Sequence, residues 1–485
     1  MRPSFIMGGL FTIAVLLTGF LSNRWWKRLN QPTVLCPGCN VIIIDIDTFR
    51  ADAFDCKGKP GDSGYPPNLC EFVKDAFKFE NNFSQYYWTR PSMVSTHTGL
   101  YPPEHGVDGY SEGYILPSNI LTAPEVFQRN GYSTLRAGQM GDSYTISNES
   151  RTDRGYDLFY NDNDKEFKYG PLLINSMDFS VSPVYSFFYF GSLHSPYLLN
   201  PDNPVISSIN RDPFFPITKE EMDKSFEEYL LNVFPGLAKR KVSFSDVFVK
   251  IYSRFVLSTY NTAIEKNASV ANNIQLVYEA NIKEFDKDIE IYLKSLEQLK
   301  EQGNSVIIFM SDHGEAFYEH GYFEHVTSPG SQYNEFIYVP LYIYVPGIKG
   351  RIISQISSNI DIFPTIFEII GIDDSALINQ GHGRSLVSLM DRRRLWGNLQ
   401  DRFAISFSNS VVSIQNAKSK MIIDILNENR VEIYDLAKDP GEKNNIESNS
   451  ESIKKYFMRQ LKLVFGFNFK GLGLNWRERF GKSVN

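Results

Sequence analysis

The sequence predicts an α/β fold built on a doubly wound, mainly parallel sheet. Short apolar runs rich in β-branched residues, such as 40–44 (NVIII) and 305–310 (SVIIFM), are typical of strands buried on both faces. Segments whose apolar residues recur at three and four positions, the longest at 271–302, lie between such runs and predict helices. Because strands alternate with helices along the chain, the pattern favours the doubly wound arrangement.

Composition narrows the class of protein. The chain has 485 residues, 42% of them apolar and 22% charged, so it can bury a large core. This composition excludes a disordered chain, a collagen-like protein and a small disulfide scaffold. Its formal charge of −7 gives no chain-wide basic surface, and we therefore expect no nucleic-acid partner.

Residues 1–28 predict a membrane anchor. Residues 5–21 carry no charge and are just long enough to cross a bilayer as a helix, and Trp25 and Trp26 suit its interface. A cleaved signal peptide is the rival interpretation, but no small-residue cleavage site precedes the body of the chain. Basic residues after the span outnumber those before it, a bias that by itself would place the body in the cytoplasm.

The cysteines all lie in the first seventy residues, at Cys36, Cys39, Cys56 and Cys70. Outside the cytoplasm such a set predicts disulfides, whereas in a reducing compartment the Cys-Pro-Gly-Cys sequence would suggest metal or redox chemistry. The spacing leaves the pairing open.

We expect the body of the chain to divide into a large α/β domain at residues 38–400 and a C-terminal subdomain with a tail at 401–485. Within the first domain, residues 198–273 carry charged helical patches and little strand character, which predicts a helical insertion. From residue 403 onward, short β-rich runs separated by polar turns predict a small second sheet.

Acidic residues and a histidine follow two of the predicted strands. Asp45 and Asp47 end the first strand, and Asp312 and His313 follow the run at 305–310. The carboxyl ends of parallel strands open onto the ligand crevice of an α/β sheet. Oxygen and imidazole ligands suit a divalent cation such as Mn, Zn, Ca or Mg. Taken singly, each of these residues could instead cap a helix or form a salt bridge.

A segment with hydroxyl side chains, 87–93 (YWTRPSM), leads into a predicted helix. A hydroxyl next to a helix start and near a metal can be deprotonated and used as a nucleophile. The structural alternative is that Thr89 or Ser92 only caps this helix.

In their order and in their amino-acid sequences, these segments resemble the sulfatase family of the alkaline-phosphatase superfamily over residues 38–448. The matching segments include NVIIIDIDTFRADAFDCKG, WTRPSMVSTHTGLYPPEHGV, FFYFGSLHSPY, SDHGEAFYEHGYFEH and VEIYDLAKDPGEKNNI. The resemblance implies an alkaline-phosphatase-like fold and a divalent metal held by Asp47, Thr89, Asp312 and His313.

The resemblance also implies catalytic roles for three residues. Thr89 stands at the family's nucleophile position, and His194 falls in the stretch whose histidine faces the leaving group. His325 is a further histidine of the second metal-binding loop.

Several positions depart from the family's pattern. Thr89 stands where true sulfatases carry a Cys or Ser that is oxidised to formylglycine, and threonine cannot yield that aldehyde. Met93 replaces an arginine of the same maturation signature, and Gln139 replaces a sulfate-contacting lysine. The family's doubled aspartate after the first strand is not kept, which leaves Asp47 as a ligand and the role of Asp45 open.

These departures predict a metal-dependent hydrolase or transferase that acts on phosphate esters, because a threonine nucleophile resembles the phospho-transfer branch of the superfamily. In that mechanism Thr89 attacks phosphorus, while His194 and His325 protonate the leaving group and stabilise charge on the phosphoryl oxygens. One alternative is a sulfate-ester hydrolase that works without formylglycine. The other is a catalytically silent sulfatase-like subunit of a membrane assembly.

Other titratable residues receive structural assignments. Asp286 takes the position of a helix aspartate that supplies a second metal in some relatives, but its acidic, lysine-flanked surroundings favour a solvated face. We expect structural roles for His97 and His105, and loop positions for His320, beside the site, and for His382.

Relatives with a single N-terminal span mostly work outside the cytoplasm. Together with the clustered cysteines, this resemblance outweighs the charge bias. We therefore expect a membrane-anchored protein whose catalytic body is extracytoplasmic, in the periplasm or at the cell exterior.

Overall fold

A computed structural model describes most of residues 34–466. Within that range it leaves out residues 55, 57–64, 108–114, 139–150, 162–172, 175–181, 209–215, 217, 234–254, 257, 266–268, 326–331, 374, 392–401 and 426–429.

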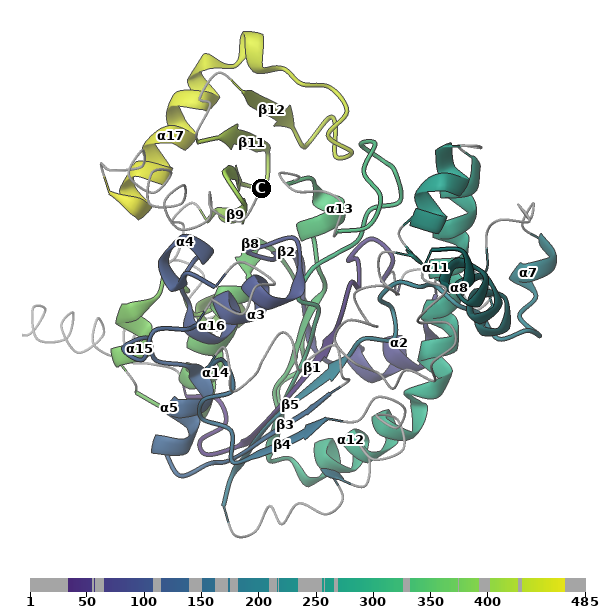
Figure 1. Cartoon of the computed structure of the whole chain (residues 1–485). Coiled ribbons are helices and arrows are strands. Elements are labelled where there is room, and N and C mark those ends of the chain that lie inside the picture. Colours follow the sequence, from purple (N-terminus) through teal and green to yellow (C-terminus); the bar gives the residue numbers. More distant parts are fainter. Residues whose placement is uncertain are drawn as a thin grey trace, which may run out of the picture.

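A mixed sheet of eight strands forms the centre of the described fold, in the order β4-β3-β5-β1-β6-β7-β2-β8 (Figure 1). Every neighbouring pair is parallel except the two that β7 makes with β6 and β2. The prediction of a mainly parallel sheet is therefore confirmed, with one reversed strand inside it. The strands are β1 (Asn40–Ile46), β2 (Phe77–Phe83), β3 (Ser133–Gly138), β4 (Leu158–Asn161), β5 (Val184–Phe190), β6 (Ser305–Met310), β7 (Leu341–Tyr344) and β8 (Ile352–Ser358).

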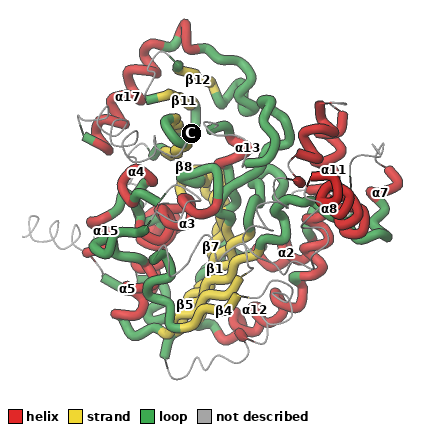
Figure 2. Tube along the Cα trace, viewed as in Figure 1, coloured by secondary structure: helices red, strands yellow, loops and turns green. Residues whose placement is uncertain are grey.

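Helices cover both faces of this sheet, as a doubly wound fold requires (Figures 1 and 2). The helices of the body are α2 (Pro67–Val73), α3 (Thr89–Thr98), α4 (Pro102–His105), α5 (Ala123–Arg129), α7 (Val205–Ser208), α8 (Lys219–Val233), α11 (Ser269–Asp288), α12 (Glu290–Gln302), α13 (Asn334–Ile337), α14 (Ile362–Ile370), α15 (Ser375–Gln380) and α16 (Val387–Met390), with a 3-10 turn at Asn359–Asp361. In the described part of the predicted insertion, α7 and α8 are helical as expected.

The alternation of side chains along β1 explains the two layers. Ile42 and Ile44 join the core formed with α2, α11 and α12. Val41 and Ile43 point to the other face and join the core formed with α5 and α14. Because successive side chains of a strand point to opposite faces, one continuous apolar run serves both cores.

A second, antiparallel sheet forms the C-terminal subdomain, as the short β-rich runs predicted. Its order is β12-β11-β10-β9, and α17 packs on it through Phe457 and Leu461. These elements are β9 (Ala404–Ser408), β10 (Val411–Gln415), β11 (Ser419–Asp424), β12 (Val431–Asp435) and α17 (Glu451–Phe465), with a 3-10 turn at Glu447–Asn449. Their core also contains Phe336 and Ile337 of α13, so the subdomain packs directly on the main body.

The structure settles the cysteine pairing that the spacing left open. Cys36 is bonded to Cys39, and Cys56 to Cys70. No helix among the described residues is long and apolar enough to cross a bilayer. The predicted anchor at residues 1–28 lies outside the part of the chain that the structure describes.

Candidate active site

Three side chains that could bind a metal meet at one edge of the large sheet. Asp47 directly follows β1, and Asp312 and His313 follow β6. Because β1 and β6 are parallel neighbours, their carboxyl ends lie side by side. Thr89, the first residue of α3, faces the same point and lies with its Oγ1 3.2 Å from His313 Nε2. The structure therefore brings together all four metal-ligating residues predicted from the sequence.

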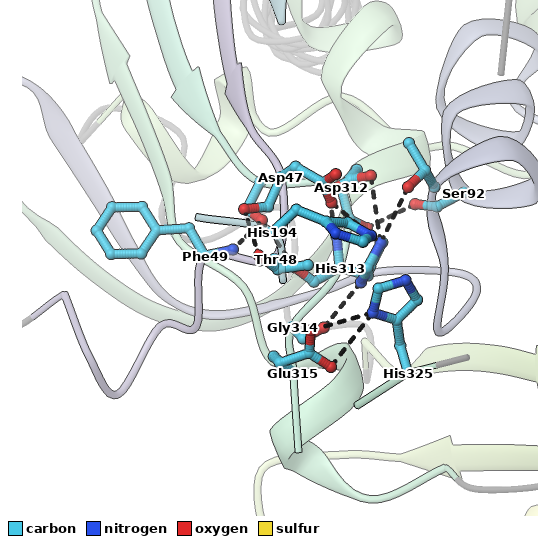
Figure 3. Close-up of polar contacts among 12 residues, drawn as sticks. Asp47, Thr48, Phe49, Ser92, His194, Asp312, His313, Gly314, Glu315 and His325 are labelled. Carbon is cyan, nitrogen blue, oxygen red and sulfur yellow. Dashed lines mark hydrogen bonds and ion pairs between the residues drawn. The ribbon is translucent and has the colours of Figure 1, made fainter. Parts of the chain in front are cut away.

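The atoms of this group converge closely enough to hold one cation (Figure 3). His313 Nε2 lies 3.2 Å from Oδ1 of Asp47 and 3.6 Å from Oδ2 of Asp312. All three residues are buried. Apart from their approach to the His313 ring, these two carboxylate oxygens have no hydrogen-bond partner among the described residues. Buried carboxylate oxygens without partners beside an imidazole fit a divalent cation.

The electrostatics of the group agree with this interpretation. Burial alone would raise the pKa of Asp47, but the hydrogen bond to His313 and nearby histidine charges hold it well below its usual value. Burial raises the pKa of Asp312 to about 7 against the pull of His313, and the charge of Asp47 adds to the rise. Burial disfavours the charged form of His313, yet the two aspartates raise its pKa to about 9. Among the described residues, the two buried carboxylates thus have the His313 ring as the one imidazole that approaches both of them.

Thr89 is held in place by the helix that it begins. Trp88 is the N-cap residue of α3 and no side chain caps this end, so the interpretation of Thr89 as a cap is wrong. Ser92, one turn further on, donates to the backbone oxygen of Asp312 at 2.6 Å and contacts Ser84 Oγ at 2.7 Å. Ser92 therefore binds α3 to the backbone of Asp312, and this contact keeps Thr89 directed at the cluster.

The two predicted catalytic histidines lie near the cluster, and the His325 ring neighbours those of His313 and His194 (Figure 3). The His325 ring centre is 4.5 Å from that of His313 and 4.9 Å from that of His194. The Nδ1 atom of His194 lies 2.7 Å from the backbone oxygen of Ser195, and Nδ1 of His325 lies 3.2 Å from both oxygens of Glu315. Each acceptor holds a proton on Nδ1, so Nε2 is the nitrogen available for chemistry.

These histidines differ in how readily they hold a second proton. Burial disfavours the charged form of His194, but the charge of Asp47 and the Ser195 carbonyl raise its pKa above the usual value. Burial lowers the pKa of His325, and the Glu315 carboxylate only partly offsets it.

Sequence reasoning missed three residues that support the site. Tyr189 of β5 donates from its hydroxyl to Oδ2 of Asp47 at 2.5 Å. Glu315 holds His325 and itself accepts a hydrogen bond from Tyr197 at 2.8 Å. Glu315 follows the Asp312-His313-Gly314 run and so carried a signal in the sequence, but both tyrosines look like ordinary core residues.

Two family models match this chain. A sulfatase model matches residues 39–372, and a model of the C-terminal region of N-sulphoglucosamine sulphohydrolase matches residues 318–464. The chain belongs to the sulfatase family. It is an ester hydrolase of the alkaline-phosphatase superfamily.

Curated relatives in this family match over most of the chain. A choline-sulfatase of Rhizobium meliloti (strain 1021) is 24% identical over 84% of this chain and 82% of its own length. An N-acetylglucosamine-6-O-sulfatase of Bacteroides thetaiotaomicron is 23% identical over 92% of this chain and 88% of its own length.

Solved structures share the fold. One, a complex with the substrate D-glucosamine-2-N,6-O-disulfate, has a TM-score of 0.64 at 19% identity and covers 92% of this chain and all of its own. A phosphonate monoester hydrolase of Agrobacterium radiobacter has a TM-score of 0.62 at 18% identity and covers 88% of this chain and 95% of its own.

Two of the departures from the sulfatase pattern, Thr89 and Met93, lie on α3. Met93 is buried, and its Sδ lies 3.9 Å from Nη2 of Arg136. Arg136 is fully buried on β3, with its guanidinium 4.8 Å from the centre of the Phe187 ring. A different cation therefore packs beside the place of the missing arginine. Gln139 lies outside the described residues.

The remaining candidates take structural positions. Asp286 is 1% exposed and accepts hydrogen bonds from the backbone of Asn68 and Leu69 at the start of α2. The expectation of a solvated face for Asp286 is therefore wrong, because its carboxylate caps a helix. Asp45 is fully buried on β1 and is not one of the three residues that converge as a metal group.

Four other histidines are bound to the surrounding fold. His97 contacts Met93 O at 2.8 Å and Tyr156 Oη at 3.0 Å, and His105 contacts Ser95 Oγ at 3.0 Å, which confirms their structural roles. His382 lies 2.7 Å from Glu104 and His320 lies 2.6 Å from Glu335, both in loops as expected.

Proposed function

We propose that the chain hydrolyses or transfers phosphate esters through Thr89, with a divalent cation bound by Asp47, Asp312 and His313. One observation carries the proposal: Thr89 Oγ1 lies 3.2 Å from His313 Nε2, at the point where the two aspartates converge. A metal-assisted attack requires the hydroxyl to lie among the metal ligands.

Three carboxylate or hydroxyl oxygens and one imidazole nitrogen would hold the cation. When bound, a divalent cation acidifies the adjacent hydroxyl and offsets negative charge on the phosphoryl group. Tyr189 contributes by fixing one oxygen of Asp47, which leaves the other directed at His313.

In the proposed reaction Thr89 loses its hydroxyl proton to solvent. Its Oγ1 then forms a bond to phosphorus while the bond from phosphorus to the leaving oxygen breaks. His194 donates a proton from Nε2 to the leaving oxygen, because its Nδ1 is committed to Ser195. His325, oriented by Glu315, directs Nε2 to the phosphoryl oxygens. Water or a second alcohol then forms a bond to phosphorus while the bond from phosphorus to Oγ1 breaks. The attacking group gives its proton to Nε2 of His194, and Oγ1 regains a proton from solvent.

Mass spectrometry tests the nucleophile. The metal-loaded protein is incubated with an aryl phosphate and quenched in acid, and we expect a phosphate adduct on the peptide that contains Thr89. Thr89→Ala should give no adduct and lose at least about 10³-fold in turnover, because the attacking oxygen is gone. Thr89→Ser, which keeps the hydroxyl, is the matched control. Full activity of Thr89→Ala would rule out the assignment.

Sulfate-ester hydrolysis without formylglycine is the second candidate. It is favoured by the relatives, which are named as a choline-sulfatase and an N-acetylglucosamine-6-O-sulfatase. Paired assays with aryl phosphate and aryl sulfate of the same leaving group separate the two. A higher kcat/KM for the sulfate would replace the first candidate with the second.

We also propose that residues 1–28 anchor the protein with its body outside the cytoplasm. Two disulfides support an oxidising compartment. Residue 35 enters the fold beside Ile369 at the amino end of β1, whereas Asp47 lies beyond the carboxyl end, so the site would face away from the bilayer. Protease added to intact spheroplasts should digest the body. Protection of the body until the membrane is lysed would contradict this location.

A further inference from the structure

The C-terminal subdomain reaches toward the candidate site through a buried ion pair. Lys420 of β11 is fully buried, and its Nζ lies 2.5 Å from Oε1 of Glu442, which is 1% exposed. Lys420 Nζ also donates to Oδ1 of Asn334 at 3.0 Å, and the second oxygen of Glu442 accepts from the Asn334 backbone N–H at 2.7 Å. Two subdomain side chains thus hold the first residue of α13.

A histidine contact strengthens the same junction. Nε2 of His320 lies 3.0 Å from the backbone oxygen of Glu442, and Nδ1 lies 2.6 Å from Oε1 of Glu335 in α13. The His320 ring stacks on Tyr333 with 3.7 Å between ring centres. The subdomain, α13 and the loop that precedes His325 are therefore joined at one place.

The α13 helix in turn fixes the peptide next to a metal ligand. The Gly314 N–H donates to the backbone oxygen of Phe336 at 2.7 Å. A Cβ at residue 314 would lie 2.2 Å from the backbone oxygen of Glu335, so only glycine permits this approach. The Gly314 carbonyl accepts from Nδ1 of His313 at 2.8 Å. The two peptide groups that flank Gly314 thus have separate roles: the first is held by α13 through the Gly314 N–H, and the second orients His313 through the Gly314 oxygen.

We propose that Lys420 and Glu442 are positioning residues for His313. They fix α13, and α13 fixes Gly314 through its N–H. The Gly314 carbonyl oxygen keeps the proton on Nδ1 of His313 and directs Nε2 at the two aspartates. Groups that orient a metal-ligating histidine set metal affinity even though they do not touch the metal. The inference rests on the proposed cation site and is independent of whether the ester is a phosphate or a sulfate.

The test measures affinity for Mn²⁺ by competition with a chelator, together with thermal unfolding, on the full chain. We expect Lys420→Met to bind Mn²⁺ about tenfold more weakly than the wild type. Phe457→Leu is the stability control, because it loosens the core under α17 in the same subdomain but leaves the ion pair in place. Lys438→Met is the charge control, because Lys438 is an exposed lysine of that subdomain.

Weaker Mn²⁺ binding by Lys420→Met, with wild-type affinity in both controls, supports the proposal. A Lys420→Met protein that melts earlier but binds Mn²⁺ as the wild type does would overturn it. If that variant does not fold, Lys420→Met/Glu442→Gln replaces it, because it removes both charges of the pair and still deprives Asn334 Oδ1 of its donor. A wild type that binds no divalent cation would remove the proposed site itself, which is a distinguishable result.

Discussion

The candidate site and the junction of the C-terminal subdomain are both buried clusters of carboxylates around a cationic side chain, yet their charges are matched differently. At the junction, one oxygen of Glu442 forms an ion pair with Lys420, and the other accepts a hydrogen bond from the Asn334 N–H. At the site, Asp47 and Asp312 share only His313, and one oxygen of each has no further partner among the described residues.

A buried carboxylate destabilises a fold unless hydrogen bonds or opposite charge compensate it. The charges of Glu442 and Lys420 are therefore matched at the junction, whereas the proposed cation would supply the positive charge that the site lacks. The contrast makes a prediction for the free energy of unfolding of the metal-free protein. Removing a carboxylate should leave it unchanged or raise it at the site, and should lower it at the junction.

The largest effect is expected for Asp312→Asn in the site. We expect turnover to fall by roughly 10³-fold, because a metal ligand supplies several kcal/mol of transition-state stabilisation. The metal-free variant should unfold at the same temperature as the wild type or higher, because one of two adjacent buried charges is gone. Calorimetry in the presence of a chelator measures the unfolding temperature, and an activity assay measures turnover. A large fall in the unfolding temperature would contradict the proposed difference between the two clusters.

Glu442→Ala tests the opposite cluster. Removing one partner of a buried pair leaves Lys420 uncompensated, and we expect a loss of about 3–5 kcal/mol in the free energy of unfolding. Urea unfolding measures the loss. Glu451→Ala, an exposed acidic residue at the start of α17, should change the midpoint little. Equal effects of both variants would show that the junction is not a matched cluster.

Asp286 sharpens the comparison, because it is a carboxylate that the sequence placed among possible metal ligands. Its two oxygens accept from the backbone of Asn68 and Leu69, so it belongs with the matched carboxylates. We expect Asp286→Ala to cost about 1 kcal/mol in unfolding free energy with unchanged metal content. A fall in metal content, measured by elemental analysis, would instead identify Asp286 as a ligand.

The smallest expected effect is a pH dependence at the junction. Burial disfavours the charged form of His320, but the hydrogen bond and charge of Glu335 raise its pKa above the usual value. The stabilisation from protonated His320 is therefore complete below the unfolded pKa of about 6.5 and is lost as the pH rises through the raised folded value. The stability difference between wild type and His320→Gln should shrink from pH 6 to pH 9. A constant difference would show that His320 does not titrate there.

The large sheet and the metal group were predictable because their signals are local. The runs that became β1 and β6 are mostly apolar and buried on both faces. Asp47 follows β1 directly, and Asp312 and His313 follow β6 after one serine. Parallel neighbours bring such ends together, so strand order alone placed the ligands.

The parts that sequence reasoning missed depend on contacts between distant segments. The reversed strand β7 resembles any other buried strand, because the direction of a strand leaves no mark in its apolar pattern. Tyr189 supports Asp47 only because β5 lies beside β1. Asp286 looked solvated because acidic and lysine neighbours surround it in the sequence, whereas its own side chain turns to the start of α2.

The disulfide between Cys56 and Cys70 ties the segment that follows Asp47 to α2 across a sequence separation of 14 residues. Closing a loop of that length stabilises a fold by about 3 kcal/mol through the unfolded chain. A protein prepared from a reducing cytoplasm would lack this disulfide, which lies close in sequence to the candidate metal ligand Asp47. Low metal content in such a sample could then result from the missing disulfide and not from a missing ligand. Metal stoichiometry should therefore be compared only between samples in which this disulfide is formed.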